Sequence, residues 1–179
     1  EVLDTFKTIV TKGKVSSNIG LMTFKEYQKF MNAPHRMDLM ISSMEKNGCW
    51  NCNQKCLHCY ASGEKLSSVS ELSKSEWMEI IDKLQDAMVP QITFTGGEPT
   101  LNIELLNNCL HYIKNKNEKI FTVINTNGFR LSKLADILSS IDSIALSRHH
   151  YNDDINSSIF HLCSVPSKQI INSFSDKSK

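Results

Sequence analysis

The chain has 179 residues, 40% of them hydrophobic, and its 20 basic and 19 acidic residues give a formal net charge of +1. This composition can bury one sizeable core, and the near-neutral charge gives no electrostatic reason to expect a nucleic acid partner. The sequence contains neither a membrane-length apolar run nor the apolar stretch of a signal peptide near its start. We therefore expect a cytoplasmic protein whose cysteines stay reduced.

The first 36 residues are expected to form a helical lead-in. Within them, "FKEYQKFM" (24–31) places apolar residues at helical spacing after Thr23, which can cap a helix. From residue 37 to residue 179 we expect a single domain in which short apolar runs alternate with helical patterns. Runs rich in β-branched and aromatic residues indicate four strands, over residues 37–43, 91–95, 119–125 and 143–147.

Three helical patterns accompany these strands. The first begins near Ser73, where Glu76 completes a capping box, and Pro90 stops it. In each pattern the apolar residues recur on one face. They are Trp77, Ile80, Ile81, Leu84 and Met88 in the first helix, Leu105, Leu106, Cys109, Leu110 and Ile113 in the second, and Leu134, Ala135, Ile137 and Leu138 in the third.

Strands that alternate with helices of this length predict an α/β fold of parallel βαβ units with right-handed crossovers. A polar segment follows each strand: "CWNCNQKCLHCY" (49–60), "GGEPT" (96–100), "TNG" (126–128) and "RHHYNDD" (148–154). Ligands of parallel sheets bind beyond the carboxyl ends of the strands. We therefore expect these four segments to converge on one rim of the sheet.

Four of the six cysteines lie between residues 49 and 59, and three kinds of site compete for them. Two Cys-x2-Cys pairs could hold zinc, but only three residues separate the pairs, whereas zinc sites usually insert about a dozen. A role as small buried hydrophobes is disfavoured by the polar residues between the cysteines. The third possibility takes Cys52, Cys56 and Cys59 as Cys-x3-Cys-x2-Cys, a loop that wraps three irons of a 4Fe-4S cluster and leaves one open.

This triplet, followed by Tyr60 and by "GGEP" (96–99) one βα unit later, resembles the radical S-adenosylmethionine (SAM) enzymes over about residues 37–154. The resemblance implies a partial (β/α) barrel of six βα units with outer helices. Only four strands are predicted here, so we expect a core truncated after the fourth unit. It also implies a 4Fe-4S cluster and SAM as cofactors, with reductive cleavage of SAM to a 5′-deoxyadenosyl radical that abstracts hydrogen from a substrate.

The resemblance implies a role for individual residues. The implied cluster ligands are Cys52, Cys56 and Cys59, and Cys49 stays outside the triplet as a free thiol. The implied contacts to SAM are His58 and Tyr60 near the adenine, Gly96, Gly97, Glu98 and Pro99 at the methionyl ammonium, Thr126 and Asn127 after the third strand, and Ser147, Arg148 and His149 after the fourth. His149 occupies a position where family members often have aspartate.

Several of these residues also have an ordinary structural interpretation. Gly-Gly-Glu-Pro can be a plain strand-to-helix turn, and Asn-Gly is a common turn dipeptide. Arg148 could bind a carboxylate of SAM or of the substrate, or form a surface ion pair with Asp153 or Asp154. Outside the loop, Cys109 is expected in the core and His111 in solvent.

The partners implied are a substrate that is a peptide or a small molecule and a reductant such as flavodoxin or ferredoxin, with no nucleic acid and no membrane. A competing function is a non-catalytic module in which four cysteines hold zinc or a structural cluster. A further possibility is a family member that binds SAM without cleaving it.

Overall fold

The computed structural model describes residues 33–42, 51–59, 70–116, 119–160 and 171–172. The chain divides into two units, residues 1–32 and 33–179, and all described residues belong to the second. The predicted helix that follows Thr23 therefore lies outside the described residues.

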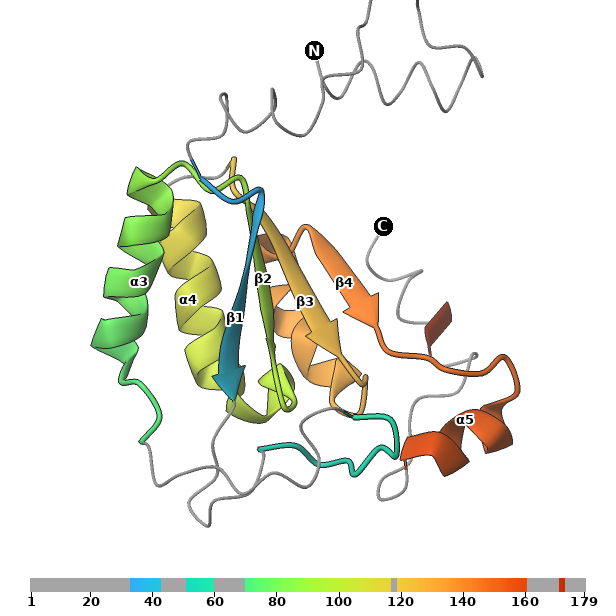
Figure 1. Cartoon of the computed structure of the whole chain (residues 1–179). Coiled ribbons are helices and arrows are strands. Elements are labelled where there is room, and N and C mark those ends of the chain that lie inside the picture. The colour runs from blue at the N-terminus through green and yellow to red at the C-terminus, as the bar shows by residue number, and fades with distance from the viewer. Residues whose placement is uncertain (1–32, 43–50, 60–69, 117–118, 161–170, 173–179) are drawn as a thin grey trace, which may run out of the picture. The chain divides into compact units, whose positions relative to one another are not determined.

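A parallel four-stranded sheet organises the second unit (Figure 1). Its strands are β1 (Arg36–Ser42), β2 (Gln91–Gly96), β3 (Phe121–Thr126) and β4 (Ser143–Leu146), and they lie side by side in chain order. All three neighbouring pairs are parallel. The predicted α/β fold of parallel βαβ units is confirmed.

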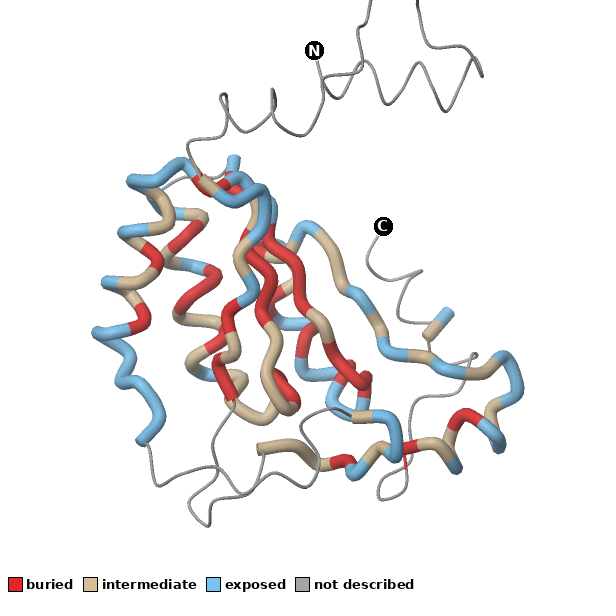
Figure 2. Tube along the Cα trace, viewed as in Figure 1, coloured by how far each residue is buried: buried red, intermediate tan, exposed pale blue. Residues whose placement is uncertain are grey.

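Helices follow the strands along the chain. They are α3 (Lys74–Asp86), the 3-10 helix η1 (Pro99–Asn102), α4 (Ile103–Lys116), the 3-10 helix η2 (Leu131–Ser140) and α5 (Asp153–Phe160). Of these, α3, α4 and η2 pack against the sheet in one hydrophobic core, which they share with β1, β2 and β3. Along β2, Ile92 and Phe94 belong to this core and are fully buried, because alternate residues of a strand face the same side. Figure 2 shows burial concentrated in the strands and in the helix sides that face them.

Helix α3 begins as predicted but ends earlier. Ser73 is the N-cap and forms a complete capping box with Glu76. The helix stops at Asp86, and Met88 follows with a positive φ of 59° and 68% of its surface exposed. The prediction that Met88 continues the buried face was therefore wrong. The left-handed turn at Met88 directs the chain toward β2 and buries Val89 instead.

The third predicted helix is a 3-10 helix rather than an α-helix. Its buried residues stand three positions apart, which matches the three residues per turn of a 3-10 helix. They are Leu131, Leu134, Ile137 and Ser140. Ala135, which the 3.6-residue pattern placed on the apolar face, is exposed.

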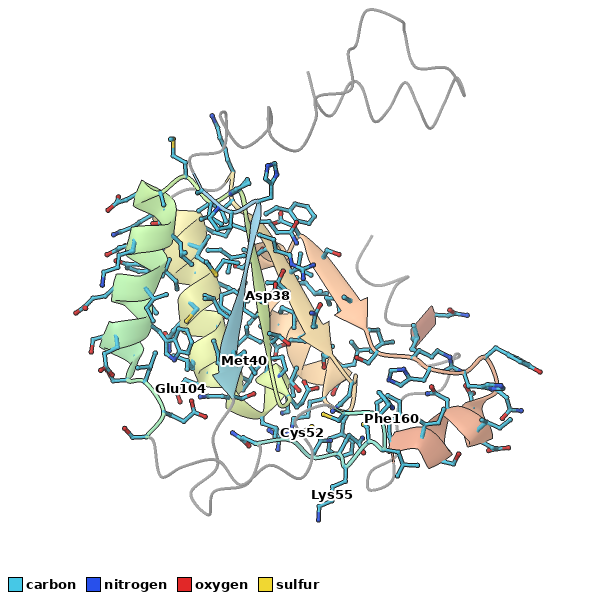
Figure 3. The ribbon with its side chains drawn as sticks, in the orientation of Figure 1. Asp38, Met40, Cys52, Lys55, Glu104 and Phe160 are labelled. Atoms are coloured by element: carbon cyan, nitrogen blue, oxygen red, sulfur yellow. The ribbon has the colours of Figure 1, made fainter. Side chains whose placement is uncertain are left out.

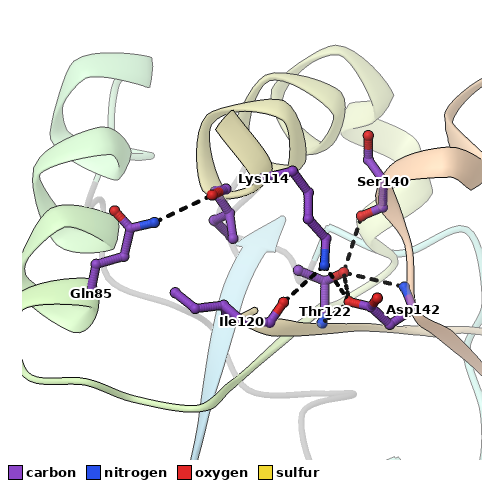
Figure 4. A network of polar contacts seen from close by, with 7 residues as sticks. Gln85, Lys114, Ile120, Thr122, Ser140 and Asp142 are labelled. Carbon is purple, nitrogen blue, oxygen red and sulfur yellow. Dashed lines mark hydrogen bonds and ion pairs between the residues drawn. The ribbon is translucent and has the colours of Figure 1, made fainter. Parts of the chain in front are cut away.

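A polar network joins the start of β3 to the approach to β4, at the sheet end opposite the cysteine loop (Figure 4). Asp142 Oδ2 accepts hydrogen bonds from Lys114 Nζ at 2.5 Å and from the backbone N and Oγ1 of Thr122 at 2.7 and 2.8 Å. Lys114 Nζ also donates to the Ile120 carbonyl at 2.9 Å. Burial acts to raise the pKa of Asp142, but these hydrogen bonds outweigh it and lower the pKa below its usual value.

Asp142→Asn is expected to destabilise the protein by about 1–2 kcal/mol at neutral pH, because it weakens hydrogen bonds made to a charged group. The folded-state pKa lies below the unfolded one, so this stabilisation is complete above the unfolded value, about 3.9, and is lost as the pH falls through the folded-state value. Urea unfolding at neutral pH and below pH 3 should show the difference between wild type and variant shrinking. Asp136→Asn, on the exposed side of η2, is the control, and an equal effect there would contradict the prediction.

No helix in the described ranges is both long and apolar enough to span a membrane.

Candidate functional site

The cysteine loop, residues 51–59 in the described part, lies beyond the carboxyl ends of the strands. Figure 3 shows Cys52 and Lys55 of this loop near Phe160 of α5, at the end of the sheet where β1 to β4 finish. The segments that follow β2, β3 and β4 all contact this loop, as the distances below establish. The predicted convergence of the polar segments on one rim is confirmed for these segments.

The two glycines at the end of β2 hold the amino-terminal side of the cysteine loop. Gly97 N donates to the Ser42 carbonyl at 2.9 Å, and Glu98 N donates to the Asn51 carbonyl at 3.0 Å. A Cβ atom at Gly97 would lie 1.9 Å from the Asn51 oxygen, which is far inside contact distance. Gly96 has φ of 141°, a conformation that favours glycine. These glycines therefore allow two backbone segments to touch.

Glu98 is a buried carboxylate, 1% exposed, that ties the β2 loop to the β3 loop. Its Oε1 accepts from the backbone N and Oγ1 of Thr100, at 3.1 and 2.5 Å, and from Thr126 Oγ1 at 2.7 Å. Its Oε2 accepts from the backbone N of Asn127 at 2.8 Å. Pro99 begins η1 at its first position, as the turn interpretation predicted. Within the protein, the Glu98 carboxylate thus positions the chain after β3.

Asn127, whose backbone bonds to Glu98, contacts the cysteine loop through its side chain. Its Nδ2 donates to Asn53 Oδ1 at 2.9 Å and contacts Cys52 Sγ at 3.9 Å. Cys52 Sγ also accepts from the backbone N of Gln54 at 3.4 Å. Asn127 is only 7% exposed. The structure therefore brings Asn127 and Glu98 to the same side of the first predicted cluster ligand.

Cys52, Cys56 and Cys59 share one short loop and form no disulfide with any described residue. Burial, and then the charges of Glu98 and the other two cysteines, raises the pKa of the Cys52 thiol to about 11, against a favourable hydrogen bond from Gln54. Burial and the charge of Cys59 likewise raise the pKa of Cys56. Negative charge is therefore unfavourable in this loop unless a cation accompanies it.

The donor set of this loop fits an iron-sulfur cluster in kind. Thiolates are the usual cluster ligands, and bound metal is what stabilises them in the deprotonated form. Within the described residues, no three Cys, His, Asp or Glu side chains converge closely enough to hold a single metal ion. The loop thus supplies three thiols of the right type on a segment held by its neighbours.

The segment after β4 contributes a further side of the site. Ser147 N donates to the Thr126 carbonyl at 2.8 Å. Arg148 pairs with Asp153, one of the two ion-pair partners predicted for it. Its Nε and Nη1 are buried and have no hydrogen-bond partner among the described residues. Beyond the bonds that Nη2 makes to Asp153 and to the Tyr151 carbonyl, the guanidinium therefore has two further nitrogens that can donate.

His149 meets the cysteine loop directly. Its ring lies edge-on to His58, with centroids 4.1 Å apart, and tilted against Phe160 at 5.1 Å. Burial, and then the neighbouring His58, lowers the pKa of His149. His149 thus contacts the cysteine loop at His58, between Cys56 and Cys59.

Helix α5 holds this side of the site and was not predicted from the sequence. Asn156, 1% exposed, accepts from the backbone N of His149 and of His150, at 2.8 and 3.2 Å. The carbonyl of Phe160 accepts from Lys55 N at 3.3 Å. Asn152, whose side chain caps the first turn ahead of two acidic residues, was the available signal for this helix.

Four further residues were given a place from the sequence, and the structure describes two of them. Cys109 is fully buried in α4 and His111 is exposed, and both predictions are confirmed. Tyr60, predicted beside the adenine, and Cys49, predicted outside the triplet, lie outside the described residues.

Comparison with known proteins gives one family. Residues 51–169 match the family model of the Radical SAM superfamily. A solved structure, described as native anSMEcpe with bound AdoMet, aligns with a TM-score of 0.61 at 19% identity, over 80% of this chain and 40% of that one. At this identity the likeness concerns the fold.

Curated relatives match over parts of their length. The chain is 34% identical to an Fe-coproporphyrin III synthase of Methanosarcina barkeri and 37% identical to an S-adenosylmethionine-dependent nucleotide dehydratase of Flammeovirga pacifica, over 55% and 59% of its own length. It is 30% identical to a GTP 3',8-cyclase of Actinobacillus pleuropneumoniae over 52%. It spans only 24%, 37% and 30% of these three proteins, whose names describe three different reactions.

Proposed function

The chain belongs to the radical SAM superfamily, and from this premise we propose that it binds a 4Fe-4S cluster through Cys52, Cys56 and Cys59 and cleaves SAM reductively. The observation that carries the proposal is the direct contact of the Gly96–Glu98 turn with the cysteine loop at Asn51. A plain strand-to-helix turn does not require a glycine pressed against the backbone that precedes a cysteine. Once bound and reduced by an external electron donor, the cluster would supply the electron for reductive cleavage of SAM.

The chain's own residues hold the two cofactors in this proposal. Three thiolates from one loop would leave the cluster without a fourth protein ligand, and SAM would bind at that open position. The residues that would hold SAM there are those of the Gly96–Pro99 turn together with Thr126, Asn127, Ser147 and His149. Both oxygens of Glu98 accept hydrogen bonds inside the protein. In this proposal Glu98 therefore acts by fixing the positions of Thr126 and Asn127.

Arg148 is the proposed carboxylate contact. Two of its buried nitrogens have no partner within the described residues, and an unpaired buried donor is costly. A guanidinium with donor nitrogens to spare suits a carboxylate, because a hydrogen bond between two charged groups is stronger than one between neutral groups. The carboxylate of SAM or of a substrate would meet this need. Asp153 fixes the other side of the guanidinium.

The substrate is proposed only as a peptide or a small molecule, and the electron donor as a small redox protein such as flavodoxin or ferredoxin. The relatives' names describe a synthase, a dehydratase and a cyclase. Such variety is usual for one fold whose chemistry depends on the site.

Anaerobic reconstitution of this chain with iron and sulfide is expected to yield about four irons per chain. After reduction, added SAM should change the EPR spectrum, because SAM binds the open iron, and 5′-deoxyadenosine should accumulate. Iron and zinc analysis, EPR and chromatography measure these three results. One zinc per chain without iron would overturn the proposal and support the four-cysteine module. An EPR change without 5′-deoxyadenosine would identify a member that binds SAM but does not cleave it.

A further inference from the structure

The side-chain amide of Asn127 is held in one orientation by its surroundings. Its Oδ1 accepts a hydrogen bond from the backbone N of Phe129 at 2.9 Å, so the oxygen must face that N–H group. The Nδ2 group then points away from Phe129, toward Asn53 Oδ1 at 2.9 Å and Cys52 Sγ at 3.9 Å. An amide turned the other way would set oxygen against oxygen at Asn53 and lose the bond to Phe129. The donor therefore faces the sulfur.

The backbone beneath Asn127 is held equally firmly. Its N–H donates to Glu98 Oε2 at 2.8 Å, and the neighbouring Thr126 Oγ1 donates to Glu98 Oε1 at 2.7 Å. Thr126 Oγ1 also accepts from the backbone N of Gly128 at 3.0 Å. The buried Glu98 carboxylate thus holds the chain through two neighbouring residues, the side chain of Thr126 and the backbone N–H of Asn127. This arrangement restricts movement of the donor relative to Cys52.

From this geometry we infer that Asn127 is a positioning residue for Cys52 whose amide raises the reduction potential of the cluster, an inference that rests on the proposed function. An N–H donor aimed at a ligand sulfur stabilises the extra negative charge that the cluster acquires on reduction, and such bonds are among the determinants of cluster potentials. The effect is strengthened because Asn127 is buried and poorly screened by water.

The same contact assigns Glu98 a second effect on the cluster. Its carboxylate is buried and accepts a hydrogen bond from Asn127, the residue whose amide contacts Cys52 Sγ, so its negative charge opposes further negative charge at that sulfur. Asn127 is the group that stands between them, bonded to Glu98 through its backbone and to the cysteine loop through its amide. By donating toward Cys52 Sγ, the Asn127 side chain therefore offsets part of the electrostatic repulsion between Glu98 and negative charge on that sulfur.

The test compares the midpoint potential of the reconstituted cluster in wild type, Asn127→Ser and Asn127→Leu by anaerobic EPR titration. Serine can still accept from Phe129 N in a turn but is too short to reach the sulfur, and leucine matches the size of asparagine without its donor. We expect reduction to become about tenfold less favourable in both variants, a shift of about 59 mV toward negative potential for one electron. The g-values of the reduced cluster should change with it.

Thr100→Val is the matched control. It removes the hydroxyl bond to Glu98 Oε1, a loss within the same buried network, and leaves the Asn127 amide in place. We expect a lower melting temperature and an unchanged potential. The inference is overturned if Asn127→Ser and Asn127→Leu keep the wild-type potential, or if Thr100→Val shifts it equally. If wild type assembles no SAM-responsive cluster, the proposed function fails first, and that result is distinct from an unchanged potential in the variants.

Discussion

Changing any one of Cys52, Cys56 and Cys59 to alanine is expected to abolish assembly of the 4Fe-4S cluster and, with it, formation of 5′-deoxyadenosine. The three thiols are the proposed ligands, and two remaining thiols cannot hold three irons. Iron content per chain after anaerobic reconstitution, together with absorbance of the cluster in the visible range, measures the loss. The effect should be nearly complete for each of the three, since they act as a unit.

Two other cysteines serve as matched controls for this prediction. Cys109→Ala removes a thiol that is fully buried in α4, so it should lower stability moderately and leave iron content unchanged. Cys49→Ala changes the fourth cysteine of the sequence cluster, which the triplet does not use. Retention of iron by Cys49→Ala supports the triplet, whereas loss of the metal there, as severe as at Cys56, supports the four-cysteine module.

Gly97→Ala is expected to prevent stable cluster loading and to lower the free energy of unfolding by about 1–3 kcal/mol. The added methyl group would lie 1.9 Å from the Asn51 carbonyl oxygen and 2.4 Å from its carbon, both of which are backbone atoms. The cysteine loop must move away to relieve the clash, and the Glu98 N to Asn51 O hydrogen bond breaks. Iron content and urea unfolding of the variant test the two effects separately.

Ser42→Ala is the control for the same contact region. Ser42 is buried, and its hydroxyl has no hydrogen-bond partner among the described residues, so its loss should be neutral or slightly stabilising. Full iron loading by Gly97→Ala would show that the loop does not need its close approach to the glycines. Loss of iron in Ser42→Ala would point to general sensitivity of the region.

The sequence predicted most of the elements because local chemistry is sufficient to specify them. The capping box of Ser73 and Glu76 begins α3, and the β-branched run that includes Ile92 and Phe94 forms β2 in the core. Failures occurred where a second element decides the outcome. Met88 has the right spacing for the helix, but the chain must reverse there to enter β2, and η2 adopts three residues per turn against the sheet.

In the candidate site, too, the sequence indicated some residues and only the structure showed their partners. Residue types and spacing identified a thiol-rich loop but left three kinds of site open for it. The resemblance to the radical SAM enzymes then singled out Cys52, Cys56, Cys59 and Gly-Gly-Glu-Pro. The partners of these residues come from distant parts of the chain. Glu98 bonds to Thr126 and Asn127, and His58 meets His149.

The sequence by its own chemistry specified an α/β chain with a thiol-rich loop, since strand and helix periodicity and cysteine spacing are local properties. Only the tertiary structure decided which atoms face the loop. It brought the Asn127 amide to Cys52 across 75 positions of sequence and pressed Gly97 against Asn51. The register of parallel strands, and the helices that pack on them, set these distances, and no local pattern encodes that register.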